Sequence, residues 1–294
     1  MIRLIASDMD GTLLNDKLEV SAGNAAAIQR AQNAGIEFLV ATGRGLSEAQ
    51  PLVAAHDLHT AFITVNGARV FDTAGKLAVE AAIAPELVAT IVESLVADNL
   101  YFELVTNHGI YSDSRVRRIQ QIADVLVRLN PDTSYKIAVA LAAARLELMD
   151  INYVDDYHTL LTTPDLIVYK VIAFDQGGQA ALAPARQKLE ATKRLIITSS
   201  AVNNIEINAL AAQKGNALKA YAETQGLTLD ECMAIGDNLN DASMIKMAKY
   251  GVAMGNAVPE IKAMAWWTTA KNTDDGVAQA IDRAILINEQ ARQQ

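Results

Sequence analysis

"LIASDMDGTLLN" (residues 4–15) runs from an apolar stretch directly into two carboxylates, Asp8 and Asp10, that lie one residue apart. The stretch from Arg3 to Ser7 predicts a buried strand, and the glycine at position 11 predicts that the strand has ended by then. Like charges this close repel each other and raise each other's pKa. The pair is therefore costly unless a cation, a proton transfer or both make use of it.

The sequence on either side of this stretch alternates between strands and helices. A helix is predicted over 21–35, with Ser21 as its N-cap and Gly35 just beyond its end. Apolar strands are predicted at 36–42 and 61–67, with a helix between them. Strands that alternate with helices of 10 to 15 residues indicate parallel βαβ units and an open, doubly wound sheet.

The middle of the chain has a different, strand-rich pattern. A hairpin is predicted to turn at residues 73–75, and Pro85 opens a helix whose apolar stripe contains Leu87, Ile91 and Leu95. Short strands and helices continue until Lys214, where the regular alternation returns.

We therefore expect an α/β fold with a discontinuous core. A doubly wound, Rossmann-like parallel-sheet core is predicted over residues 1–82 and 209–294. A second, inserted α+β domain is predicted over residues 83–208.

Composition limits the classes of function. The formal net charge of −9 argues against a nucleic-acid surface, and no apolar run is long enough to span a membrane. The start of the sequence lacks a secretory signal. The single cysteine, Cys232, excludes an internal disulfide framework and fits a cytoplasmic protein. The densest basic cluster, Arg115, Arg117 and Arg118, is interpreted as a solvated helix face.

Polar side chains follow the predicted core strands, where α/β sheets bind ligands. Asp8 and Asp10 end the first strand, Thr42 and Gly43 the second, and Asp237 the strand near 232–237. The same edge is expected to hold Arg44, Asn66, Lys214, Asn238, Asn240 and Asp241.

This inventory suits phosphoryl transfer. Clustered carboxylates are suitable ligands for Mg²⁺, and Thr42, backbone N–H groups and Lys214 can hold phosphoryl oxygens. Lys214 lies in the first turn of its helix, where a cation opposes the helix dipole. That position favours an anionic partner over the alternative of a solvated surface lysine.

Other interpretations are weaker. The paired aspartates alone could be turn residues, and Asp237 or Asp241 could serve to cap a helix. An EF-hand fails because Gly11 stands at loop position four instead of six and the bidentate glutamate is missing. The four histidines have no metal-ligand spacing, and no dinucleotide-binding or P-loop motif follows the first strand.

The order of five segments resembles the haloacid dehalogenase-like superfamily. The segments are "DMDGTLLN", "ATGR", "VNGA", "QKGNALK" and "GDNLNDASM…GVAMGNA". They look most like the Cof-type phosphatases of that superfamily, which carry a large inserted cap (subclass IIB). The resemblance implies that residues 83–208 are this cap and that the cap selects the substrate. The loop "EINALAAQKG" (206–215) departs from the family, which commonly has a proline and a glycine before the lysine.

The resemblance implies a role for each matched residue. Asp8 would be the nucleophile that forms an aspartyl-phosphate, and Asp10 would protonate the leaving oxygen and then deprotonate water. Mg²⁺ would be held by Asp8, by the Asp10 backbone carbonyl and by Asp237. The phosphate cradle would contain the Met9 N–H, Thr42, Gly43, Lys214 and Asn240, and the role of Asp241 stays open between metal binding and support.

The expected function is a Mg²⁺-dependent phosphatase for small phosphate monoesters, among them sugar phosphates. A phosphomutase on the same fold and a non-catalytic regulator that binds phosphometabolites are the alternatives. The presence of Asp10 favours an enzyme over a regulator, because binding alone needs no proton donor.

Overall fold

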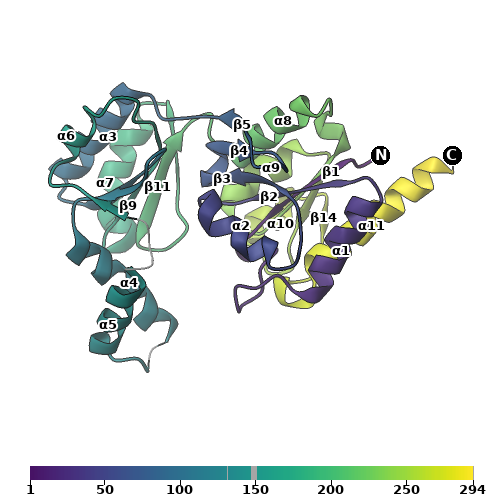
Figure 1. The fold of residues 1–294 in the computed structure, drawn as a ribbon, viewed down its shortest axis with the longest axis horizontal. Coiled ribbons are helices and arrows are strands. Elements are labelled where there is room, and N and C mark those ends of the chain that lie inside the picture. The colour runs from purple at the N-terminus through teal and green to yellow at the C-terminus, as the bar shows by residue number, and fades with distance from the viewer. Residues whose placement is uncertain (131, 147–150, 294) are drawn as a thin grey trace. The chain divides into compact units, whose positions relative to one another are not determined.

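The computed structural model describes residues 1–130, 132–146 and 151–293 and contains two compact units (Figure 1). Unit 1 comprises Met1–Ala81 and Ala211–Gln294, and unit 2 comprises Ala82–Leu210. Unit 1 therefore contains both ends of the chain, and unit 2 is one continuous segment inserted into it.

The described part of unit 1 is built on an eight-stranded sheet with the order β14-β13-β12-β1-β2-β3-β4-β5. The strands from β14 to β3 run parallel, and β4 and β5 are antiparallel additions at one edge. This confirms the predicted doubly wound core and the hairpin between β4 and β5. The strands are β1 Leu4–Asp8, β2 Glu37–Ala41, β3 Ala61–Thr64, β4 Arg69–Phe71, β5 Leu77–Glu80, β12 Cys232–Gly236, β13 Tyr250–Ala253 and β14 Trp267–Thr268.

Helices pack on this sheet in pairs: α1 lies beside α11, and α8 lies beside α9. Ser21 caps α1 as predicted, because its Oγ accepts the N–H of Asn24 at 3.0 Å, and Gly35 follows the helix with φ +78°. The helices are α1 Ala22–Asn33, α2 Leu46–Ala54, α8 Lys214–Thr224, α9 Ala242–Met247, α10 Pro259–Met264 and α11 Gly276–Arg292. No described helix of the protein is long and apolar enough to cross a membrane.

The parallel register brings three strand ends to one edge of the sheet. Asp8, the last residue of β1, pairs with Ala41 at the end of β2, and Ser7 pairs with Ile235 of β12. All five residues of β1 are buried, and Cys232 at the start of β12 is a core residue as expected. The residues that follow β2 and β12 therefore lie on either side of Asp8.

The part of unit 2 that the structure describes contains a six-stranded sheet with the order β10-β11-β9-β6-β7-β8. Neighbouring strands are antiparallel except for β7 and β8. The strands are β6 Tyr101–Thr106, β7 Gly109–Ser112, β8 Ile151–Tyr153, β9 Val168–Phe174, β10 Leu195–Thr198 and β11 Asn204–Ala209. The helices are α3 Pro85–Ala97, α4 Arg115–Leu129, α5 Tyr135–Leu146, α6 Tyr157–Leu160 and α7 Gly178–Glu190.

The core of unit 2 lies between its sheet and two helices. The predicted stripe of α3, formed by Leu87, Ile91 and Leu95, is buried there together with residues of α7, β6, β9 and β11. Pro85 is the first residue of α3, where its missing N–H costs nothing.

The interpretation of the basic cluster on α4 as wholly solvated is wrong for Arg118. Its Nη1 lies 3.0 Å from Oε2 of Glu103, a β6 residue that is 1% exposed. Burial raises the pKa of Glu103, and the Arg118 charge opposes this rise. The sequence alone could not indicate this pairing, because it joins a strand to a helix across the unit.

Candidate active site

A buried lysine joins two carboxylates at the carboxyl edge of the unit 1 sheet. Lys214, the first residue of α8, is fully buried, and its Nζ lies 2.5 Å from Oδ1 of Asp8 and 2.7 Å from Oδ1 of Asp241. The helix-dipole argument predicted an anionic partner for this lysine, and the structure gives it two. A solvated surface lysine is excluded.

Asp241 supports the loop that follows β12. Its Oδ2 accepts the backbone N–H groups of Asp237 at 3.0 Å and of Asn238 at 3.1 Å, and its Oδ1 accepts Lys214. A β-carbon on Gly236 would lie 2.6 Å from Asp241, so the loop can approach this carboxylate only with a glycine there. Most of the hydrogen-bonding capacity of the Asp241 carboxylate is therefore used within the protein.

Asp237 completes a group of three carboxylates. One oxygen from each of Asp8, Asp237 and Asp241 lies within 4.8 Å of the other two. Asp237 also accepts a hydrogen bond from Thr12 Oγ1 at 3.0 Å. Gly11 has φ +82°, and a β-carbon there would lie 2.6 Å from Asp237 Oδ2. Three clustered carboxylates beside a single ammonium form an oxygen-rich, anionic donor set that fits a hard divalent cation such as Mg²⁺.

The electrostatics of the cluster reflect this excess of negative charge. Burial raises the pKa of Asp8 well above its usual range; the Asp241 and Asp237 carboxylates add to the rise, and the Lys214 ammonium opposes it. The pKa of Asp237 is also raised, chiefly by burial and secondly by the negative charge of Asp241. Burial alone lowers the pKa of Lys214, but the two carboxylates outweigh burial and raise it, so the ammonium stays charged.

Asp10 faces a different partner from Asp8. Arg44 donates from Nε to Oδ2 of Asp10 at 2.9 Å and from Nη2 to Oδ1 at 2.5 Å. The Asp10 side chain is 46% exposed, whereas Asp8 is buried. Each of the two neighbouring aspartates thus has its own cation. Sequence reasoning placed Arg44 at this edge but gave it no role; a signal was present, because four carboxylates at one edge call for more than one cation.

The remaining predicted residues belong to the segments that follow β1, β2, β3 and β12. Thr42 is fully buried directly after β2, and its Oγ1 accepts the Arg44 N–H at 3.1 Å. Gly43 lies so near Asn66 that a β-carbon would be 2.8 Å from its Oδ1. Met9 directly follows Asp8 and is buried, and Asn240 lies in the 3₁₀ turn Leu239–Asp241.

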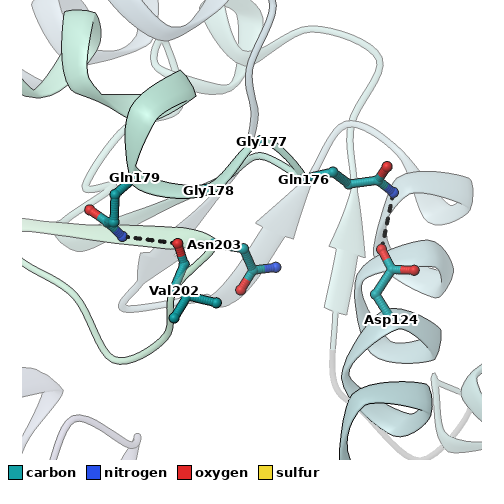
Figure 2. A pocket seen from close by; sticks show the side chains of 7 residues that line it. All are labelled: Asp124, Gln176, Gly177, Gly178, Gln179, Val202 and Asn203. Carbon is teal, nitrogen blue, oxygen red and sulfur yellow. Dashed lines mark hydrogen bonds between the residues drawn. The ribbon is translucent and has the colours of Figure 1, made fainter. Parts of the chain in front are cut away.

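Unit 2 contains a separate cavity of about 620 Å³, shown in Figure 2. Gln176 donates to Asp124 of α4 at 3.1 Å, and Gln179 of α7 donates to the Val202 carbonyl at 3.3 Å. The described residues that line the cavity are Asp124, Gln176, Gly177, Gly178, Gln179, Val202 and Asn203. None of these residues is cationic, so they offer hydrogen bonds but no positive charge for a phosphoryl group.

Known proteins resemble this chain in both sequence and fold. Residues 5–281 match a family model described as haloacid dehalogenase-like hydrolase. Phosphatase YwpJ of Bacillus subtilis is 33% identical over 286 residues, which cover 97% of this chain and 100% of that protein. The Bacillus subtilis 5-amino-6-(5-phospho-D-ribitylamino)uracil phosphatase YwtE is 32% identical over 286 residues, covering 97% and 98%. The solved structure of a haloacid dehalogenase-like hydrolase from B. subtilis is 32% identical and superimposes with a TM-score of 0.83, covering 96% of this chain and 99% of that one.

Proposed function

Because the chain belongs to the haloacid dehalogenase-like hydrolase family, we propose that it hydrolyses small phosphate monoesters in a Mg²⁺-dependent reaction with a covalent aspartyl-phosphate on Asp8. The observation that carries this proposal is the buried contact of Asp8 with Lys214, next to Asp237 at the carboxyl edge of the sheet. A carboxylate beside a fixed ammonium and a cation-binding donor set is suited to attack an anionic phosphorus centre.

Asp8, Asp237 and the Asp10 backbone carbonyl would hold the metal. Asp241 is assigned a supporting role, because its oxygens already accept Lys214 and two backbone N–H groups. When bound, Mg²⁺ would neutralise charge on the carboxylates and the phosphoryl oxygens and orient the phosphoryl group.

The phosphoryl oxygens would be held by the cationic end of Lys214 and by neutral donors around it. These donors are the Thr42 hydroxyl, the Met9 and Gly43 N–H groups and the Asn240 amide. Thr42 follows β2 and Asn240 follows β12, the two strands that pair with β1, so donors come from both sides of Asp8.

In the first half-reaction, the Asp8 carboxylate attacks phosphorus, and the bond from phosphorus to the leaving oxygen breaks. Asp10 gives its proton to that oxygen, which leaves as an alcohol. Lys214 binds Oδ1 of Asp8, so Oδ2 is the oxygen assigned to the attack.

In the second half-reaction, Asp10 removes a proton from water, whose oxygen attacks the phosphorus of the aspartyl-phosphate. The acyl phosphate bond breaks, inorganic phosphate is released, and Asp8 regains its carboxylate. Two moderate barriers thereby replace one very high barrier, because hydrolysis of phosphate monoesters is among the slowest uncatalysed reactions.

Sugar phosphates and related polyol phosphates are the first substrates to test. The name of YwtE describes a phosphoribityl compound as the substrate of that relative, which is 32% identical to this chain. An alkoxide leaving group of this kind needs a proton donor, and Asp10, two residues after Asp8, is the residue proposed to supply the proton.

The test is a screen for release of inorganic phosphate from phosphorylated metabolites, with Mg²⁺ and with chelator. The wild type should release phosphate only with the metal and without a sugar bisphosphate, and Asp8→Asn should be inert on every ester. A strict requirement for a bisphosphate would indicate a phosphomutase instead. Tight binding of phosphorylated metabolites without turnover would indicate a regulator.

A further inference from the structure

We propose that Arg44 is a positioning residue for Asp10, which holds the Asp10 carboxylate in the orientation from which it exchanges protons with the leaving oxygen and with water. This inference rests on the proposed function. It concerns a residue that the reaction scheme above does not use.

The contact has the geometry of a fork on a carboxylate. Nε and Nη2 of Arg44 reach different oxygens of Asp10, at 2.9 and 2.5 Å. Two parallel hydrogen bonds fix the plane of the carboxylate as well as its position, which a single contact from a lysine does not do.

Arg44 is itself held by its backbone. Its N–H donates to Thr42 Oγ1 at 3.1 Å, and its carbonyl accepts the N–H of Val65 at 3.0 Å. Val65 and the next two residues all have positive φ, so the chain adopts an unusual left-handed turn at the point where it meets Arg44. The backbone that carries the Arg44 side chain is therefore held in place by hydrogen bonds. The hydrogen bonds of the guanidinium to Asp10 raise the pKa of Arg44.

Fixing Asp10 matters because its side chain is exposed and has no other described hydrogen-bond partner for its carboxylate. An exposed aspartate can adopt several rotamers, and only some of them direct an oxygen toward Asp8. Misplacement of a catalytic group by about 1 Å can cost on the order of 10² in rate. Loss of Arg44 should therefore weaken the proton transfer of Asp10 and leave the binding of the phosphoryl group intact.

Two other roles for Arg44 make different predictions. If Arg44 bound the phosphoryl group directly, its loss would weaken the binding of every ester, with or without Asp10. If the ion pair were an ordinary surface contact, its loss would change neither burst rate, because exposed ion pairs contribute little to the folded structure.

The experiment compares the wild type with Arg44→Ala, Arg44→Lys, Asp10→Asn and the double variant Arg44→Ala/Asp10→Asn. Phosphorylation of Asp8 is measured in single-turnover burst experiments with two esters. One ester is p-nitrophenyl phosphate, whose leaving group needs little protonation, and the other is the sugar phosphate that the wild type hydrolyses fastest. The substrate dissociation constant is obtained from the concentration dependence of the burst rate.

We expect Arg44→Ala to slow the burst with the sugar phosphate by about 10- to 100-fold and with the nitrophenyl ester by less than about 3-fold. The dissociation constants should stay within about 3-fold of the wild type. In the Asp10→Asn background the arginine substitution should have no further effect, because the group that it positions is already lost. Arg44→Lys should recover only part of the rate, since it restores the charge without the fork.

Arg30→Ala is the matched control. Arg30 of α1 also donates from Nε and Nη2 to a carboxylate, in this case to the single oxygen Oδ1 of Asp282 of α11, at 3.2 and 2.7 Å, and this pair is exposed. It should leave both burst rates unchanged. Equal losses on both esters, a raised dissociation constant or a further loss in the Asp10→Asn background would overturn the positioning role. Absence of any burst in the wild type would overturn the proposed function instead.

Discussion

Replacing Lys214 by methionine should destabilise unit 1 far more than removal of any surface lysine. Methionine has a similar length and no charge, so the substitution leaves Asp8 and Asp241 buried without their shared cation. With an effective dielectric constant of about 20, one unit-charge pair at 2.7 Å is worth about 6 kcal/mol before desolvation is subtracted. Breaking a buried pair by removing one partner costs about 3–5 kcal/mol in practice.

The assay is urea unfolding in the presence of chelator, followed by tryptophan fluorescence. Both tryptophans of the protein, Trp266 and Trp267, belong to unit 1, so the signal reports on the unit that contains the site. With a urea slope of about 2 kcal/mol per molar, the expected loss shifts the midpoint down by about 1.5–2.5 M.

Two further variants test the reasoning. Lys219 lies on the same helix, is 53% exposed and pairs with Glu223 at 2.7 Å. The variant Lys219→Met should lower the free energy of unfolding by less than about 0.5 kcal/mol. In the double variant Lys214→Met/Asp241→Asn, the amide oxygen can still accept the loop N–H groups while one buried charge is removed. That variant should be at least about 1 kcal/mol more stable than Lys214→Met alone. A loss below about 1 kcal/mol for Lys214→Met, or no recovery in the double variant, would refute this account of the cluster.

Two other predictions follow from close approaches and buried charge. Gly11→Ala should raise the Mg²⁺ concentration needed for half-maximal phosphatase activity by about 10-fold, because the new methyl group displaces Asp237. The control is Gly75→Ala, since Gly75 has a similar φ of +76° but open space around it. An equal change in both variants would contradict the mechanism. Arg118→Met should lower the stability of unit 2 by about 3 kcal/mol in thermal unfolding followed by circular dichroism, since it leaves Glu103 buried without its cation. Arg117→Met, which loses an exposed contact to Asn99 at 3.4 Å and no contact to Glu103 among the described ion pairs, should have little effect. A comparable loss in that variant would show that the Glu103 pair is not the cause.

The parts of the fold that sequence predicts are those with local signals. Ser21 and Gly35 mark the ends of α1, and the four-residue spacing of Leu87, Ile91 and Leu95 marks the buried face of α3. Both signals depend on residues within one or two turns of each other. The helix α5 was not predicted, because its sequence "YKIAVALAAARL" is apolar on every side and has no stripe to detect.

The candidate site shows the same division. The position of Lys214 at a helix start predicted an anionic partner, because the helix dipole acts locally. Contacts between segments that are far apart in the sequence decide which carboxylates pair with Lys214. They also decide that Asp10 pairs with Arg44 instead. The fork between Arg44 and Asp10 joins residues 34 positions apart, and periodicity carries no information at that range.

The insertion of unit 2 into unit 1 determines when the site can exist during synthesis. Asp8 and Lys214 are separated by 206 positions, and β1 must wait for β12 before its second neighbour in the sheet is made. Unit 2, in contrast, is one uninterrupted segment, and all of it leaves the ribosome before Lys214 does. A folded insert fixes the distance between its two ends. An unfolded segment of this length would instead raise the entropic cost of bringing β12 to β1. The nascent chain therefore holds an unpaired β1 edge until β12 has been made, and the contact between Asp8 and Lys214 can form only after residue 214 has left the ribosome.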